Sequence, residues 1–196
     1  MRKKHSAVVM TLSRQQWYHH TGINDILREA GIPKGSFYNF FESKENFGEE
    51  VIHHYGKQQY TWLKEILEDP SKTPFERIQK LYDDLKYYSR EEQYLQGCMI
   101  NNLSVEVAGL SEKIAKVADE EFRHWVEIIA QAIHEGQQTG EIRSDISAEH
   151  LAHFIHTNLY GAQSRMKATR SSEPLDMILF MTLDYFRPPV QQKVNA

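Results

Sequence analysis

Residues 31–45 read GIPKGSFYNFFESKE, a short stretch in which four aromatic residues are mixed with small polar residues and lysines. At about 100° per residue, a helix over 34–41 has two different faces. Its apolar face carries Phe37, Phe40 and Phe41. Its other face carries Gly35, Ser36, Tyr38 and Asn39. The sequence therefore predicts a helix with an aromatic back and a small, hydrogen-bonding front.

A second short helix precedes this one. Thr21 is a good N-cap residue, and the segment GINDILREA behind it places its apolar residues on one side. Gly31 ends that helix and Pro33 opens the next, each in its preferred position. Two short helices joined by a tight turn form a helix-turn-helix, whose second helix can enter a major groove about 12 Å wide. A plain helical hairpin with a Phe-rich back also fits, and the pattern alone leaves both open.

Seven residues are candidates for DNA contacts, because they combine cations, hydroxyls and a helix N-terminus that favours anions. Phosphate contacts are predicted for Thr21, Lys34, Gly35, Tyr38 and Lys44. Base-edge contacts are predicted for Ser36 and Asn39. Gly35 is among the phosphate contacts because a glycine lets a phosphate approach the backbone closely.

The segment TGINDILREAGIPKGSFYNFFESKENF, residues 21–47, resembles the DNA-binding domain of TetR-family transcriptional repressors. The resemblance implies a homodimer, an operator with two-fold symmetry and a C-terminal domain that binds an inducer and weakens DNA binding. Two positions depart from the family pattern at the end of the first helix, where this chain has Ser13 and Trp17. The connection between the first two helices is therefore expected to differ in shape.

The rest of the chain also reads as helical, with Gly and Pro at the ends of periodic segments. Helices are predicted at 4–16, 22–30, 33–41, 44–67, 74–92, 97–108, 112–138, 147–169 and 174–186. The predicted fold is all-α, with about nine helices. We expect a three-helix DNA-binding domain over 1–48 and an effector-binding and dimerisation domain over 49–196.

Charge and composition agree with this division. Residues 1–48 hold seven Lys and Arg against four Asp and Glu, whereas 49–196 hold sixteen against twenty-three. We call residues 1–48 the head. A basic head followed by an acidic domain suits a protein in which the head alone binds a polyanion, although the N-terminal tail supplies three of these cations. One Cys excludes an internal disulfide, and no apolar run approaches the roughly 20 residues of a membrane span. We expect a cytoplasmic protein that does not enter the membrane.

The last two predicted helices carry more apolar residues than one buried face needs. In the family that the chain resembles, these helices pair with their copies in a four-helix bundle. The resemblance therefore implies a homodimer through about 147–187. It also implies a small-molecule pocket, for which aromatic and amide side chains indicate a largely apolar ligand. The candidates are Tyr55, Trp62, Tyr82, Met99, Asn102, Leu103, Trp125, Phe154 and Asn158, and ordinary core packing is the alternative for each.

Cys98 follows Gly97 at the start of a predicted helix, where a thiol has a lowered pKa. The Gly-Cys pair resembles the branch of the family that includes the N-ethylmaleimide-responsive repressor. That resemblance implies an alternative function, in which modification of Cys98 by an electrophile or oxidant switches the repressor. A small buried side chain is the other interpretation, and no Lys, Arg or His lies within five residues.

Other function classes fit less well. His150, His153 and His156 recur every three residues, and His53 and His54 are adjacent, but no Cys and few carboxylates accompany them. We therefore predict neither a metal nor a cofactor. An all-helical enzyme with an incidental helix-turn-helix is a rival, yet the sequence shows no nucleophile–base pair and no glycine-rich phosphate loop. An activator or a nucleoid-type binder is a further rival, and the small basic head argues against broad coating of DNA.

Overall fold

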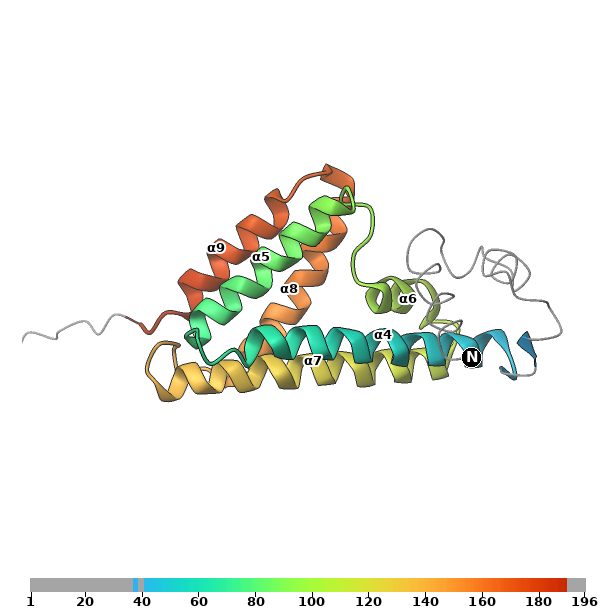
Figure 1. Cartoon of the computed structure of the whole chain (residues 1–196), viewed down its shortest axis with the longest axis horizontal. Coiled ribbons are helices and arrows are strands. Elements are labelled where there is room, and N and C mark those ends of the chain that lie inside the picture. The colour runs from blue at the N-terminus through green and yellow to red at the C-terminus, as the bar shows by residue number, and fades with distance from the viewer. Residues whose placement is uncertain (1–36, 39–40, 190–196) are drawn as a thin grey trace, which may run out of the picture. The chain divides into compact units, whose positions relative to one another are not determined.

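The computed structural model describes residues 37–38 and 41–189, and these residues contain α-helices and no strand. The helices are α4 (Lys44–Leu67), α5 (Pro74–Glu91), α6 (Met99–Val107), α7 (Glu112–Gln138), α8 (Ala148–Thr169) and α9 (Glu173–Phe186) (Figure 1). Within this part of the chain there are thus six helices rather than about nine. Each of the six corresponds to a predicted helix. The other three, at 4–16, 22–30 and 33–41, lie largely outside the described residues.

Local sequence signals explain where these helices begin. The hydroxyls of Ser43, Ser111 and Ser147 each accept a hydrogen bond from the backbone N–H three residues later, at 3.0, 3.2 and 3.2 Å. Thr73 and Glu76 form a reciprocal capping box at the start of α5. Each bond satisfies a backbone donor that the helix leaves unpaired. The helices predicted from 44, 112 and 147 therefore begin within one residue of their predicted starts.

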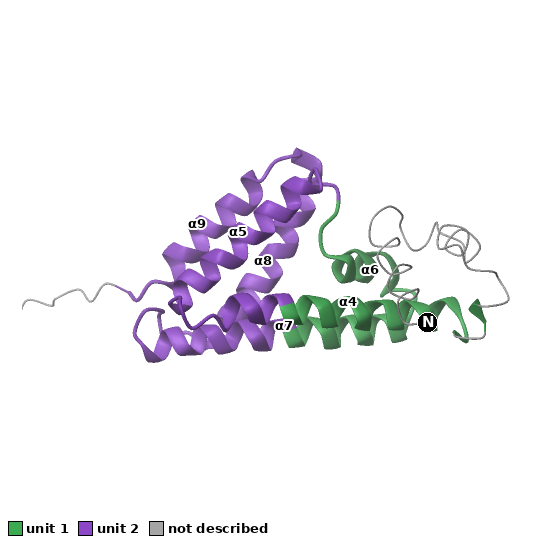
Figure 2. Ribbon diagram, viewed as in Figure 1, with its two compact units in different colours: residues 1–61, 96–124 green, residues 62–95, 125–196 purple. Residues whose placement is uncertain are grey.

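The chain divides into two compact units, coloured separately in Figure 2. Unit 1 contains residues 1–61 and 96–124, and unit 2 contains 62–95 and 125–196. Within unit 1, α6 and the first parts of α4 and α7 pack together. Within unit 2, α9 packs against α8 and α5. The domain boundary expected after residue 48 stays a prediction, because most of the proposed head lies outside the described residues.

The core of unit 1 contains aromatic residues from the end of the predicted DNA-reading helix. The ring of Phe47 on α4 lies 5.5 Å from Phe37 and 4.9 Å from Phe41, measured between centroids. These rings join a buried cluster from α4, α6 and α7 that includes Val51, Ile52, Met99, Ile100, Leu103, Val107, Ile114, Val117 and Ala118. Burial of this apolar surface joins Phe37 and Phe41 to the rest of unit 1.

The core of unit 2 contains apolar side chains of α5, α8 and α9 together with one buried polar contact. Leu81, Ile155, Leu175 and Phe186 are almost completely excluded from solvent. The Tyr82 hydroxyl lies 3.1 Å from the hydroxyl oxygen of Thr182, and both residues are fully buried. This bond joins α5 to α9, and burial raises the pKa of Tyr82 to about 12.

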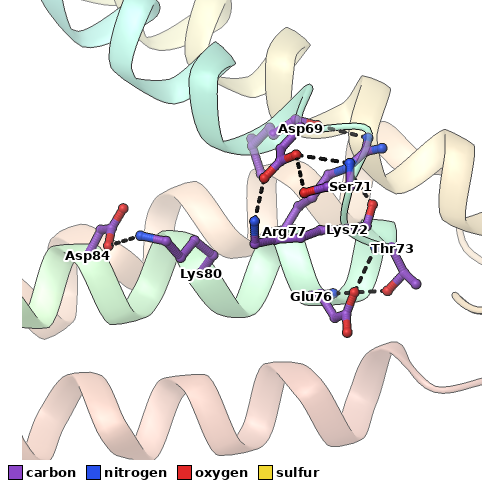
Figure 3. Close-up of polar contacts among 9 residues, drawn as sticks. Asp69, Ser71, Lys72, Thr73, Glu76, Arg77, Lys80 and Asp84 are labelled. Carbon is purple, nitrogen blue, oxygen red and sulfur yellow. Dashed lines mark hydrogen bonds and ion pairs between the residues drawn. The ribbon is translucent and has the colours of Figure 1, made fainter.

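The turn between α4 and α5 is held by a dense set of polar contacts (Figure 3). Asp69 accepts hydrogen bonds from the backbone N–H and hydroxyl of Ser71, at 2.9 and 2.6 Å. The guanidinium of Arg77 donates to the carbonyls of Leu67 and Lys72, both at 3.0 Å, and to the Glu135 carboxylate at 2.7 Å. Arg77 thereby caps α4, closes the turn and joins α7.

None of the helices in the described part of the chain has the length and apolar character that crossing a bilayer requires.

Candidate nucleic-acid interface and effector-binding residues

The structure describes two of the seven residues that the sequence predicts at the DNA interface, Tyr38 and Lys44. The other five lie outside the described residues: Thr21, Lys34, Gly35, Ser36 and Asn39. Their placement remains a prediction, and so do the departures at Ser13 and Trp17. The structure therefore bears on this interface only through the positions of Tyr38 and Lys44.

Tyr38 points to solvent from the end of the predicted reading helix. Its exposed fraction is 54%, whereas the adjacent Phe37 is 3% exposed. The backbone N–H of Phe41 donates to the carbonyl of Phe37 at 3.0 Å, which is one turn of α-helix. The separation into an aromatic back and an exposed front is therefore confirmed for this pair. It leaves the Tyr38 hydroxyl accessible to a phosphate.

Lys44 is the first residue of α4, immediately behind the N-cap Ser43. Partial burial lowers the pKa of the Lys44 ammonium, and the opposing effect of the Glu106 carboxylate is smaller. The cation lies at the positive end of the helix dipole, an unfavourable place that a nearby anion improves. This position suits a contact with a phosphate.

Five effector candidates lie in unit 1, namely Tyr55, Cys98, Met99, Asn102 and Leu103. The predicted helix begins at 97 and has Cys98 in its first turn, but α6 begins at Met99. Cys98 is therefore the N-cap residue, and its side chain makes no capping bond. Gly97 has φ 119°, a conformation that favours glycine and explains the Gly-Cys order. The Cys98 side chain is partly buried against the core cluster of unit 1.

The other candidates lie in unit 2, namely Trp62, Tyr82, Trp125, Phe154 and Asn158. The rings of Trp62 and Trp125 approach to 6.1 Å between centroids, so these two candidates are neighbours. Phe154 instead lies 5.6 Å from the Tyr185 ring of α9. Asn158 donates to the carbonyl of Phe154 on its own helix at 2.7 Å. Tyr82 is a core residue bonded to Thr182. The ten candidates, Cys98 included, thus fall into two groups, one in each unit.

Sequence reasoning missed a buried histidine beside the tryptophan pair. His156 is 6% exposed; its ring lies 6.2 Å from that of Trp125, and its Nε2 lies 2.9 Å from the Tyr160 hydroxyl. The i, i+4 spacing of His156 and Tyr160 was the available signal. Among the described residues, no group of three His, Cys, Asp or Glu side chains could hold a metal ion.

A second missed feature is the buried carboxylate of Glu121 on α7, in unit 1. It accepts hydrogen bonds from the His53 ring nitrogen Nδ1 at 2.9 Å and from the Tyr60 hydroxyl at 2.5 Å. A side chain at Gly56 would place its Cβ only 2.1 Å from Oε2 of this carboxylate. Glycine therefore makes room for Glu121, and the three polar groups join α4 to α7.

Burial makes His156 a source of acid sensitivity. Desolvation lowers its pKa to about 4, with a smaller contribution from His153, against an ordinary value of 6.5. Between these values the unfolded chain binds more protons, so the free energy of unfolding decreases as the pH falls from about 7 to about 4 and levels off below. His156→Gln should reduce the loss between pH 7 and pH 5 by about 1–2 kcal/mol in urea titrations.

The matched control for this titration is His150→Gln, because His150 is exposed on the same helix. This variant should keep the pH profile of the unmodified protein. An unchanged profile in His156→Gln would show that His156 does not remain neutral in the folded state.

Comparison with known proteins identifies the family. The family model for bacterial regulatory proteins of the tetR family matches residues 10–51, and that for the tetracyclin repressor-like C-terminal domain matches 74–180. The transcriptional repressor DhaR of Mycobacterium sp. strain GP1 is 36% identical over 183 residues, covering 92% of this chain and 89% of DhaR. The chain belongs to the TetR family. The resemblance expected from residues 21–47 is therefore confirmed.

Other TetR-family relatives agree. The transcriptional repressor NemR of Escherichia coli K12 is 28% identical over 168 residues, covering 86% of this chain and 84% of NemR. The crystal structure of reduced E. coli NemR has a TM-score of 0.85 at 27% identity, covering 96% of this chain and 98% of that chain. The crystal structure of a regulatory protein TetR from Rhodobacter sphaeroides has a TM-score of 0.86 at 25% identity, covering 94% of this chain and 97% of that chain. This chain is therefore a DNA-binding transcriptional regulator of the TetR family.

Proposed function

We propose that this TetR-family regulator is a dimeric repressor that binds an operator of two-fold symmetry and leaves it when a small, largely apolar effector binds. The observation that carries the proposal is the match to the family's N-terminal regulatory model over residues 10–51, which contain every predicted DNA contact. The relatives DhaR and NemR are named as repressors, which supports the direction of regulation. We infer that the protein acts on DNA in the cytoplasm.

In this proposal, phosphate contacts position the head and base contacts select the sequence. Phosphates are held by Thr21, Lys34, Gly35, Tyr38 and Lys44. Base edges are contacted by Ser36 and Asn39. The exposure of Tyr38 beside the buried Phe37 supports this division, because it turns the polar side of the reading helix toward solvent.

Two substitutions separate these roles. Lys44→Ala should weaken binding to all duplexes alike and lower the slope of log affinity against log salt by about 1, because one phosphate contact is lost. Asn39→Ala should instead change sequence preference, with a cost of about 1–3 kcal/mol at one base position. Fluorescence anisotropy with operator and scrambled duplexes at two salt concentrations measures both. Unaltered sequence preference in Asn39→Ala would contradict the base-contact role.

Dimerisation through about 147–187 is supported by an apolar stripe on α9. Four large apolar side chains of this helix are exposed in the single chain: Met177, Phe180, Met181 and Tyr185. Their spacings of three, four and eight residues place them on one helical face. Such a contiguous exposed patch marks an interaction surface. A second copy of the chain, related by two-fold symmetry, would cover it and match the symmetry of the operator.

The effector is expected to be recognised mainly through aromatic contacts. The neighbouring rings of Trp62 and Trp125, with the neutral His156 beside them, provide apolar surface and few hydrogen-bonding groups. This composition suits a planar or aliphatic molecule of low charge. Tyr55, Met99 and Asn102 remain candidates in unit 1, whereas the buried bond of Tyr82 to Thr182 favours a structural role for Tyr82.

The alternative to release by a bound effector is modification of Cys98, and the place of this residue at the N-terminus of α6 favours it. A thiol at this end of a helix is stabilised as the reactive thiolate. The core that it contacts contains Phe37, so a bulky adduct would disturb the described end of the head. Cys98→Ser should abolish any loss of DNA binding caused by N-ethylmaleimide, measured by anisotropy. Equal loss in both proteins would exclude the thiol mechanism.

A further inference from the structure

The first turn of α4 is fastened to the junction between α6 and α7 by polar contacts within unit 1. The hydroxyl of Ser111 donates to the Glu45 carboxylate at 2.5 Å and accepts from the backbone N–H of Ile114 at 3.2 Å. The Lys113 ammonium lies 3.8 Å from the second oxygen of Glu45. The Ser111 hydroxyl therefore caps α7 and also binds Glu45 of α4. This contact fixes the α6–α7 junction beside Glu45, which directly follows Lys44 in the sequence.

Apolar contacts hold the end of α6 at the same place. Val107, the last residue of α6, belongs to the buried cluster that also contains Phe47 of α4 and Ile114 of α7. Glu106 directly precedes Val107 and is partly buried. Its carboxylate acts electrostatically on the Lys44 ammonium, where it favours the charged form. This packing brings the end of α6, which carries Glu106, to the first turns of α4, which begin with the cation that we assign to the DNA backbone.

We propose that Glu106 determines DNA affinity, because its carboxylate competes with an operator phosphate for Lys44. This inference rests on the phosphate contact of Lys44 in the proposed function. Lys44 exchanges one anionic partner for another when DNA binds. The binding free energy therefore gains only the difference between its interaction with the phosphate and its interaction with the Glu106 carboxylate. A phosphate that binds Lys44 would also be repelled by the Glu106 carboxylate. Glu106 therefore weakens binding without contacting a base, and its effect is independent of DNA sequence.

A double-mutant cycle tests this competition. The four proteins are the unmodified chain, Lys44→Ala, Glu106→Gln and the double variant. Anisotropy is measured with an operator duplex and a scrambled duplex at about 50 mM salt, where screening is weak. Glu106→Gln should tighten binding to both duplexes by about two- to fivefold when Lys44 is present. With Ala at position 44, the same change should alter affinity by less than about 1.5-fold.

The matched control is Glu112→Gln, because Glu112 is an exposed acid in the first turn of α7, near the same junction. Removing its charge should have the same small effect whether or not Lys44 is present. Thermal denaturation of each variant verifies that the fold is intact.

Two results would overturn the inference in distinguishable ways. If Lys44→Ala weakens DNA binding but Glu106→Gln has equal effects in both backgrounds, or none, the competition is wrong and the Lys44 contact stands. If Lys44→Ala leaves affinity and salt slope unchanged, the phosphate contact itself is wrong, and the inference fails with it.

Discussion

Arg77→Met should lower the free energy of unfolding by about 2–4 kcal/mol, the largest stability effect that we expect from one polar residue. The Arg77 side chain is 10% exposed and donates to the backbone of Leu67 and Lys72 as well as to Glu135. Met fills a similar volume but donates no hydrogen bond. The carbonyl at the end of α4 is then left without its donor in a buried place.

The control for this prediction is Lys80→Met, on the same helix. Lys80 pairs with Asp84 four residues later, and its side chain is 45% exposed, so its loss should change stability by about 0.5 kcal/mol or less. Urea titrations at one protein concentration compare the two variants, since formation of the proposed dimer would make stability concentration-dependent. Equal small losses in both variants would mean that Arg77 does not hold the α4–α5 turn.

Phe180→Glu should convert the proposed dimer into monomers at micromolar concentration. Phe180 is 67% exposed at the centre of the α9 stripe, so the substitution leaves the core of the single chain intact. In the proposed interface, however, each copy buries a carboxylate without a partner, which costs several kcal/mol. Because two heads on one dimer bind both half-sites, operator affinity should fall by about a hundredfold or more.

Mass measurement by light scattering tests this expectation, with Tyr87→Glu as the control. Tyr87 is an exposed aromatic residue of α5, outside the α9 stripe, and its substitution should leave the dimer unchanged. A Phe180→Glu protein that remains dimeric would place the interface elsewhere.

Features set by local sequence were predictable. The caps at Ser43, Ser111 and Ser147 depend on bonds that span three residues, and the helices begin where those hydroxyls predict. The burial of Phe37 and the exposure of Tyr38 follow from helical periodicity alone. These signals do not require knowledge of which helices pack together.

Features set by contacts between distant segments were not predictable. Tyr82 fits a ligand pocket by residue type, but its partner Thr182 is 100 residues away along the chain. The burial of Glu121 beside Gly56 and of His156 beside Trp125 likewise depends on how the helices pack. Periodicity identifies the apolar face of a helix, but it does not reveal which buried polar group meets which partner.

The central claim is that the head reads a specific DNA sequence as part of a symmetric dimer. The most direct measurement is selection of duplexes by the purified protein from a random DNA pool, followed by sequencing. The proposal predicts enrichment of an inverted repeat whose half-sites lie about one helical turn, or a multiple of it, apart. Recovered duplexes with no shared sequence, or with a single unrepeated site, would contradict it.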